Sequence, residues 1–193
     1  MLLVMGRAYK NFWSLNTDEA VVIGILRDSI PRDVAIYMPA SAQMKNIDLA
    51  LINAANRRIL TIQVKGSRAY EPRKSEIVKF GKGSAGWFFL KCSRIYDCTT
   101  DFFIFLIYIL EEESRSGRRV IVPHTITIPT KDLQRRCQLY KRKVKGEKYS
   151  LIIWINPKIK KAFDIQDREF DLSDFLDKSG FQKLNKRLFG RNI

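Results

Sequence analysis

Histidine and cysteine are scarce in this sequence, and their scarcity excludes several classes of site. The 193-residue chain has one histidine, His124, and three cysteines, Cys92, Cys98 and Cys137. The cysteine spacing fits no zinc motif, and a lone histidine gives no histidine-based metal site and no argument for a catalytic triad or a Cys–His pair. We therefore expect a structural role for His124 and three free cysteines, used as small core residues in a reducing cytoplasm.

Long apolar segments are absent as well. The longest apolar run, Phe102 to Leu110, has nine residues, whereas a membrane-spanning helix needs about 20. The first residues lack the basic region and the apolar stretch of a secretory signal. We expect a cytoplasmic protein with no membrane partner, in which the apolar run is a buried strand.

Acidic residues are too few to balance the basic ones. Lys and Arg number 35 against 20 Asp and Glu, which gives a formal net charge of +15. A compact chain of this charge repels itself, and a polyanionic partner relieves that repulsion. The composition favours nucleic acid as the partner, although a basic protein of another kind would have the same charge.

The order of the expected elements indicates an α/β domain with a mixed central sheet flanked by helices. Residues 1–156 would form the core domain, and residues 157–193 a C-terminal helical extension bent at Gly180. Residues 71–84 are polar and contain Pro and Gly, so we expect an exposed loop there. Helices are expected over 17–28, from 129 onward and over 171–189, and strands over 33–38, 46–53, 58–65, 87–91, 102–110, 118–123 and 149–155.

Two of these strands, joined by a short turn over 54–57, carry the most informative residues. If they pair antiparallel about the midpoint of this turn, opposed residues have numbers that sum to 111. Asp48 then faces Gln63, and Lys65 lies on the same face, because side chains alternate along a strand. The other face is apolar, and this specifies the register, since a slip by one residue would bury the charged set.

Asp48, Gln63 and Lys65 together suit metal-assisted chemistry on a phosphate. A hard divalent cation prefers oxygen ligands, and the Asp48 carboxylate, the Gln63 amide oxygen and the Val64 carbonyl are the candidates. Lys65 would orient or help deprotonate the attacking water, or neutralise charge that develops on phosphorus. The spacing alone fits equally well a hairpin that has one solvated polar face.

Asp48 followed by Gln63-Val64-Lys65 at the end of the next strand resembles the PD-(D/E)xK motif of the restriction-endonuclease-like superfamily, in the variant with Gln in the acidic position. The preceding helix, with Glu19 near its start, resembles the first core helix of that family, which often supplies an extra acid. The segments 86–90, 101–105 and 120–123 resemble its later core strands. The resemblance covers residues 17–133 and implies a restriction-endonuclease-like fold, a Mg²⁺- or Mn²⁺-dependent endonuclease, and catalytic roles for Asp48, Gln63, Lys65 and Glu19.

Two positions depart from the motif and keep other functions open. Ile47 stands where the motif has proline, and Gln63 stands where it has an acid. A neutral amide binds a divalent cation less strongly than a carboxylate does, so a non-catalytic nucleic-acid-binding module is the first alternative and an interaction protein with a vestigial site the second. Glu19 is also favoured by the helix dipole alone, so its role depends on whether the helix start faces Asp48. A homodimer is compatible with this family.

Basic residues gather in two places, directly after Lys65 and before the last expected strand. Each lysine or arginine that neutralises a phosphate releases counterions, so both groups suit a nucleic-acid backbone. The alternative is a pair of solvated basic loops. The expected phosphate contacts are Ser67, Arg68, Arg73, Lys74, Lys79, Lys82, Arg135, Arg136, Lys141, Arg142, Lys143 and Lys145.

Overall fold

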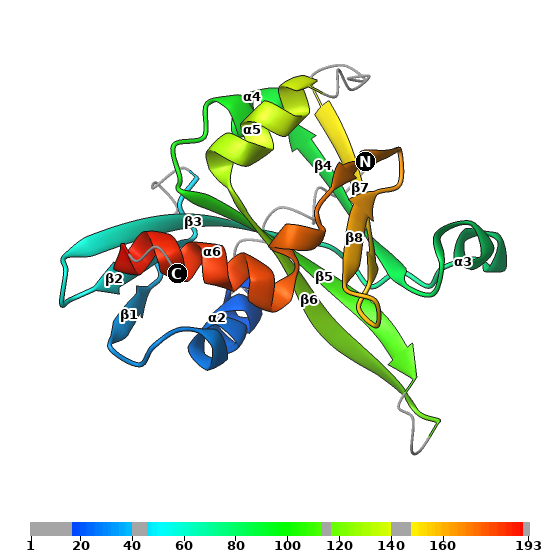
Figure 1. Cartoon of the computed structure of the whole chain (residues 1–193), viewed down its shortest axis with the longest axis horizontal. Coiled ribbons are helices and arrows are strands. Elements are labelled where there is room, and N and C mark those ends of the chain that lie inside the picture. Colours follow the sequence, from blue (N-terminus) through cyan, green and yellow to red (C-terminus); the bar gives the residue numbers. More distant parts are fainter. Residues whose placement is uncertain (1–16, 40–45, 113–116, 140–147, 191–193) are drawn as a thin grey trace, which may run out of the picture.

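A computed structural model describes residues 17–39, 46–112, 117–139 and 148–190 of the chain (Figure 1). Its first sheet has five strands in the order β1-β2-β3-β5-β6, and β3 and β5 are parallel while the other neighbours are antiparallel. The sheet is therefore mixed, as expected, but the expected strands 87–91 and 149–155 are not part of it and belong to a separate sheet. The strands of the first sheet are β1 (Val34–Tyr37), β2 (Leu49–Asn53), β3 (Arg58–Gly66), β5 (Phe102–Glu112) and β6 (Arg119–Pro129).

A second, antiparallel sheet covers part of one face of the first. Its order is β4-β7-β8-β9, with β4 (Ser84–Lys91), β7 (Lys148–Asn156), β8 (Lys161–Asp164) and β9 (Asp167–Asp171). Phe88 of β4 packs edge-on against Phe105 of β5 with ring centroids 4.9 Å apart. Ile107 of β5 and Ile153 of β7 belong to the same buried cluster, so the two sheets share one core.

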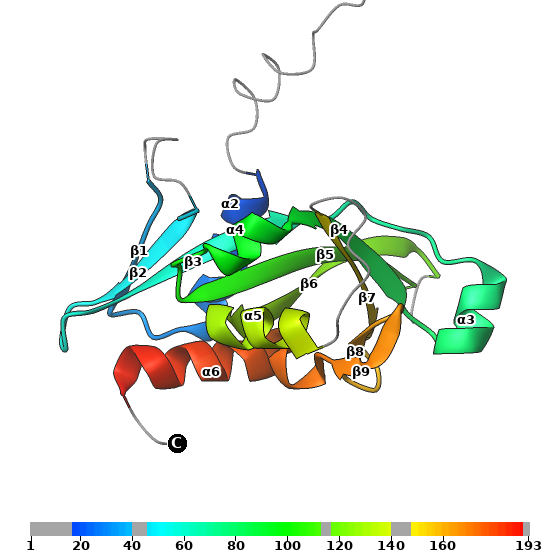
Figure 2. The ribbon, with the colours of Figure 1, turned by 90° about the horizontal axis from the view of Figure 1, so that it is seen from above.

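Helices lie on both sides of the first sheet (Figures 1 and 2). On the side away from the second sheet, α2 (Thr17–Ser29) and α6 (Asp177–Phe189) bury Leu26 and Leu184 against β2 and β3. On the other side, α4 (Cys92–Tyr96) and α5 (Thr130–Leu139) bury Ile95 and Leu133 in the core that the sheets share. The short η1 (Ser173–Phe175) precedes α6, and α3 (Lys74–Phe80) extends away from the body. The chain is thus a mixed α/β protein with helices flanking the central sheet.

The β2–β3 hairpin has the register that the sequence predicts. Leu49 pairs with Ile62, Ala50 with Thr61 and Leu51 with Leu60, so that each pair of numbers sums to 111. The apolar face of the hairpin is buried in one cluster with residues of α2 and α6. Its members are Leu49, Leu51, Leu60, Ile62 and Val64.

Three expected boundaries are wrong, each for a physical reason. The stretch 71–84, expected to be a loop, contains α3. None of the residues of α3 is buried, so the sequence has no apolar periodicity there that would indicate a helix. The strand expected to stop at Pro123 continues as β6, because β6 is an edge strand and tolerates proline. The stretch 157–193, expected to be helical, also contains β8 and β9. Gly180 lies inside α6, which is one continuous helix. The absence of a side chain at Gly180 lets α6 lie close to Thr127 and the Phe175 carbonyl.

Two smaller expectations concern cysteine and the membrane. All three cysteines are free; Cys98 and Cys137 are buried and Cys92 is half-buried, so they are core residues as expected. In the part of the chain that the structure describes, no helix is long and apolar enough to cross a bilayer.

Candidate active site

The residues predicted to be catalytic meet at the end of the β2–β3 hairpin. Asp48 directly precedes β2, and Gln63 and Lys65 belong to β3. Gln63 Nε2 donates to Asp48 Oδ2 at 3.0 Å, and the Val64 backbone N–H donates to the same oxygen at 2.7 Å. Lys65 Nζ lies 3.7 Å from that oxygen and donates to the Val64 carbonyl at 2.9 Å. The predicted convergence is therefore present, and Asp48 Oδ2 is its centre.

The backbone around Asp48 explains how the side chain reaches this place. Asn46 has a positive φ of 75°, a conformation that asparagine tolerates better than most residues. Two residues later the Asp48 N–H donates to the Ile62 carbonyl at 2.9 Å, which continues the antiparallel ladder beyond β2. Asp48 is thus held on β3 by its backbone as well as by its carboxylate.

This polar face is only partly solvated. Gln63 is 6% exposed, whereas the side chains of Lys65 and Asp48 are 22% and 25% exposed. On the neighbouring strand β5, Phe103 lies beside Gln63 and Phe105 beside Lys65, and both aromatic residues belong to the core that the second sheet covers. On this face, β3 carries polar side chains and the adjacent β5 carries apolar ones. Gln63 and Lys65 therefore lie at the rim of a hydrophobic core.

Burial and charge shift two pKa values at this rim. Burial lowers the pKa of Lys65, and the charge of Asp48 opposes that effect. Burial raises the pKa of Glu19, a hydrogen bond from its own backbone lowers it, and the charge of Asp48 raises it again. The charges of Asp48 and Lys65 both affect the pKa of Glu19, so Glu19 lies in their neighbourhood, although α2 packs on the other face of the first sheet. The catalytic role of Glu19 stays a prediction.

Asp18 fixes the start of α2 against the end of β3, a role that the sequence did not reveal. The Tyr108 hydroxyl donates to Asp18 Oδ1 at 3.0 Å, and burial followed by this hydrogen bond raises the pKa of Tyr108 to about 12. A Cβ atom at Gly66 would lie 1.9 Å from Asp18 Oδ2. Glycine after Lys65 is therefore what lets the helix approach. The only sequence signal was a second acid beside Glu19 in the first turn.

The oxygen atoms at the site match the preference of a hard divalent cation. Gln63 Oε1 is buried and has no hydrogen-bond partner among the described residues; such an acceptor costs about 1–3 kcal/mol, which a cation would offset. Among these residues no group of three or more His, Cys, Asp and Glu side chains is placed to hold a metal. The oxygen donors brought together here are the Asp48 carboxylate and the Gln63 amide, and Glu19 is a further candidate because its pKa responds to the charge of Asp48. The Val64 carbonyl, also predicted as a ligand, already accepts from Lys65.

The amide of Gln63 is oriented for a hydrogen bond and not for a shared cation. Its nitrogen faces Asp48, whereas two oxygens would face each other around a metal. Half a turn of the amide exchanges the two atoms, and nitrogen and oxygen differ little in size. The residues therefore fit a cation once this one group rotates.

The first group of expected phosphate contacts surrounds the segment that follows β3. Ser67 donates its hydroxyl to the Arg68 carbonyl at 3.1 Å, and the Arg68 side chain is exposed. Arg73 precedes α3, which carries Lys74 and Lys79, and Lys82 is exposed between α3 and β4.

The second group is divided between structural and undescribed residues. Arg136 donates to the Asp171 carbonyl at 2.7 Å and stacks over the rings of Phe170 and Phe175, so its guanidinium is used inside the protein. Arg135 is exposed and lies 3.6 Å from Asp132. The remaining four, Lys141, Arg142, Lys143 and Lys145, lie outside the described residues.

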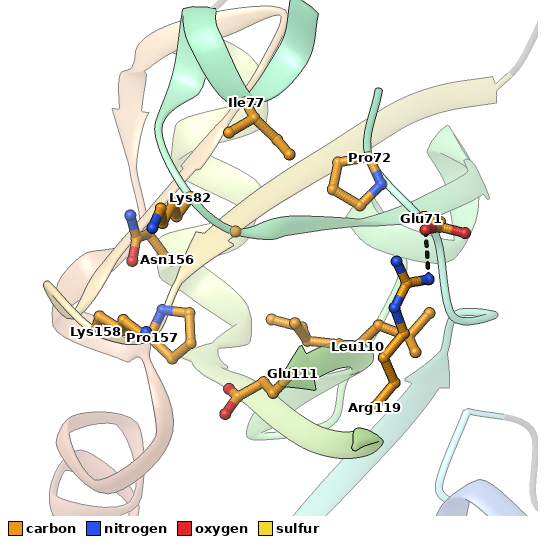
Figure 3. A pocket seen from close by; sticks show the side chains of 12 residues that line it. Glu71, Pro72, Ile77, Lys82, Leu110, Glu111, Arg119, Asn156, Pro157 and Lys158 are labelled. Carbon is orange, nitrogen blue, oxygen red and sulfur yellow. Dashed lines mark hydrogen bonds and ion pairs between the residues drawn. The ribbon is translucent and has the colours of Figure 1, made fainter. Parts of the chain in front are cut away.

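A surface hollow of about 380 Å³ lies apart from the catalytic residues (Figure 3). Basic side chains of Lys82, Arg119 and Lys158 line it together with the acidic Glu71 and Glu111. Glu71 and Arg119 form an ion pair of 2.8 Å across its wall. Of the residues that line the hollow, only Lys82 is a predicted phosphate contact, and none is a predicted catalytic residue. The hollow is therefore not the candidate active site.

His124 has the structural role that its isolation predicts. Its Nδ1 lies 2.8 Å from Asp177 and its Nε2 3.1 Å from Glu111. Asp177 Oδ1 also accepts the Thr125 N–H at 2.8 Å. The imidazole therefore links β5, β6 and the first residue of α6.

Comparison with protein-family models, with curated proteins and with solved structures finds no match to this chain. The functional argument therefore depends on the geometry and chemistry of the site.

Proposed function

We propose that this chain is a divalent-metal-dependent nuclease that hydrolyses phosphodiester bonds in nucleic acid, with DNA as the preferred substrate. The observation that carries the proposal is the convergence of Gln63, Val64 N–H and Lys65 on Asp48 Oδ2, with Glu19 electrostatically coupled to the same place. The net charge of +15 supports a polyanionic substrate.

Asp48, Glu19 and the Gln63 amide oxygen would hold Mg²⁺ or Mn²⁺. When bound, the metal would polarise the scissile phosphate and make a bound water more acidic. Asp48 orients Lys65 through the 3.7 Å ion pair, and the Val64 carbonyl fixes the ammonium from the other side. Because burial lowers the pKa of Lys65, this amine loses its proton more readily than an exposed lysine and suits transfer of a proton from water.

A non-catalytic nucleic-acid-binding module is the second candidate, and a specific observation favours it. The Gln63 amide nitrogen, the Val64 N–H and Lys65 already lie on Asp48 Oδ2, so this carboxylate oxygen has its partners without a metal. The neutral Gln63 also supplies less negative charge than the acid of the motif.

A cleavage assay tests the proposal. Wild type, Asp48→Asn and Lys65→Ala would be incubated with plasmid DNA in Mg²⁺, in Mn²⁺ and in EDTA. The matched controls change exposed residues and are Asp33→Asn, near the turn at the other end of the hairpin, and Lys178→Ala on α6. We expect metal-dependent cleavage by wild type and both controls. The two site variants should be slower by a factor of about 100 or more. Equal cleavage by the site variants would place the activity elsewhere and overturn the assignment.

A further inference from the structure

Two large aromatic side chains are exposed next to each other on β4. Trp87 is 46% and Phe89 is 63% exposed, whereas their neighbours Phe88 and Leu90 point into the core. Side chains two apart on a strand share one face and lie roughly 7 Å from each other. Adjacent exposed aromatic rings on a sheet are typical of a binding surface.

The residues around these rings leave them accessible and add positive charge. On β7, Ser150 is opposite Phe89 and Lys148 is opposite Lys91, and opposed residues share a face. Like charges in such a pair destabilise a sheet, and in the part of the chain that the structure describes no acid forms an ion pair with either lysine. An anion beside this lysine pair would relieve the repulsion.

The Trp87 ring is held in place before any ligand arrives. The Tyr70 ring packs against it with centroids 5.4 Å apart and an interplanar angle of 37°. Tyr70 is itself anchored, because its hydroxyl donates to the Glu76 carboxylate at 2.9 Å. Phe80 of α3 covers the far end of the same face by packing on Trp154 at 5.3 Å. At the other end, Phe89 and Lys91 are both exposed.

This face is continuous with the candidate active site. The Trp87 N–H donates to Ser67 Oγ at 2.9 Å, and Ser67 is two residues, roughly 7 Å of extended chain, beyond Lys65. At the other end of β4, Arg94 of α4 is close enough to Lys65 for its charge to act there. A strand bound at Lys65 can therefore reach the aromatic face without leaving the protein surface.

We propose that Trp87 and Phe89 form a stacking platform for unpaired bases, with Lys91 and Lys148 beside the phosphates, so that the substrate strand is single-stranded next to the active site. Bases in a duplex already stack on each other and cannot offer their faces to a protein. Aromatic stacking together with basic side chains is the usual means of holding a single strand with little sequence preference. This inference rests on the proposed nucleic-acid substrate, but it does not require cleavage.

Binding of labelled oligonucleotides in EDTA tests the platform. The probes are 12-nucleotide oligothymidylate, the corresponding oligouridylate and a 12-base-pair duplex, measured by fluorescence anisotropy with wild type, Trp87→Ala and Phe89→Ala. Ile121→Ala, an equally exposed apolar residue on β6 at 59%, is the matched control. We expect each platform substitution to weaken single-strand binding about tenfold, with duplex binding and the control changed less than about twofold. Trp87→Phe should retain most of the affinity.

The outcomes separate this inference from the nuclease proposal. The two single-stranded probes distinguish DNA from RNA. If wild type cleaves no substrate but the platform variants lose single-strand affinity, the platform stands and the nuclease proposal fails. Unchanged affinity in both platform variants overturns the platform, whatever the cleavage result. A change of oligomeric state in Phe89→Ala, seen by sedimentation without a change in oligonucleotide affinity, would instead identify this face as a protein interface and also overturn it.

Discussion

At the scale of single residues, only the nitrogen of the Gln63 side-chain amide has a hydrogen-bond partner among the described residues. Gln63 Nε2 donates to Asp48, whereas the buried Gln63 Oε1 has no partner in the part of the chain that the structure describes. Buried polar groups are usually paired, and exceptions concentrate where a ligand or a functional group is missing. The unpaired oxygen is therefore the one atom of the site whose environment is incomplete in the protein alone.

His124 supports a prediction about pH and stability. Burial lowers the pKa of His124, but the hydrogen bonds and charges of Asp177 and Glu111 together raise it above the usual value of 6.5. A raised pKa in the folded state means that protonation stabilises the fold. The stabilisation is complete below about pH 6.5 and is lost as the pH rises through the folded pKa.

We therefore expect the free energy of unfolding to fall as the pH rises above about 6.5, and His124→Gln to remove this dependence. Below pH 6 the variant should be less stable by about 1 kcal/mol, a value discounted because both acids are partly exposed. Urea unfolding at a series of pH values measures both effects. A pH dependence that persists unchanged in His124→Gln would assign it to other groups.

At the scale of elements, the contact between α2 and β3 depends on Gly66. A Cβ atom there would meet all three terminal atoms of Asp18, at 1.9, 2.3 and 2.8 Å, and Tyr108 keeps Asp18 from moving away. We expect Gly66→Ala to destabilise the protein by about 1–3 kcal/mol, and this cost to disappear largely in the Asp18→Ala background. A double-mutant cycle by urea unfolding measures the coupling.

Gly24 of the same helix is the matched control, because a Cβ atom there would have no neighbour within 4 Å. Gly24→Ala should stabilise the protein by about 0.5–1 kcal/mol through helix propensity alone. If Gly66→Ala were as well tolerated as Gly24→Ala, the close approach of α2 to the site would not be a property of the protein.

The same scale shows which features the sequence could predict. The β2–β3 hairpin was predictable because alternating side chains allow one register that buries only apolar residues, and this register places Asp48 beside Gln63. By contrast, the burial of Gln63 beside Phe103 of β5 has no signal in the sequence of the hairpin itself. The helix α3 was missed because it buries none of its residues.

At the scale of the whole molecule, the positive charge predicts salt-dependent binding of nucleic acid. Lys74, Lys79 and Lys82 follow the candidate site along the chain, whereas Lys178, Lys183 and Lys186 lie on α6, on the far side of the first sheet. We expect the first triple change to glutamine to reduce the slope of log affinity against log salt by about 3 on duplex DNA, since each phosphate contact contributes about 0.9.

The triple change on α6 has the same charge difference and serves as its control. It should leave the slope nearly unchanged, because α6 faces away from the second sheet and the segment after β3. Equal reductions in both triple variants would show that affinity depends on net charge and not on a defined surface.

The central claim is that the end of the β2–β3 hairpin holds a divalent cation, and calorimetric titration with Mn²⁺ tests it most directly. Wild type should bind one equivalent, Asp48→Asn should lose binding, and Gln63→Glu should bind more tightly, because an anionic oxygen replaces a neutral one. Asp33→Asn, a change of an exposed acid near the turn at the other end of the hairpin, should behave as wild type. If Asp48→Asn binds Mn²⁺ as well as wild type, or if neither wild type nor Gln63→Glu binds it, the hairpin does not form a metal site and the account is contradicted.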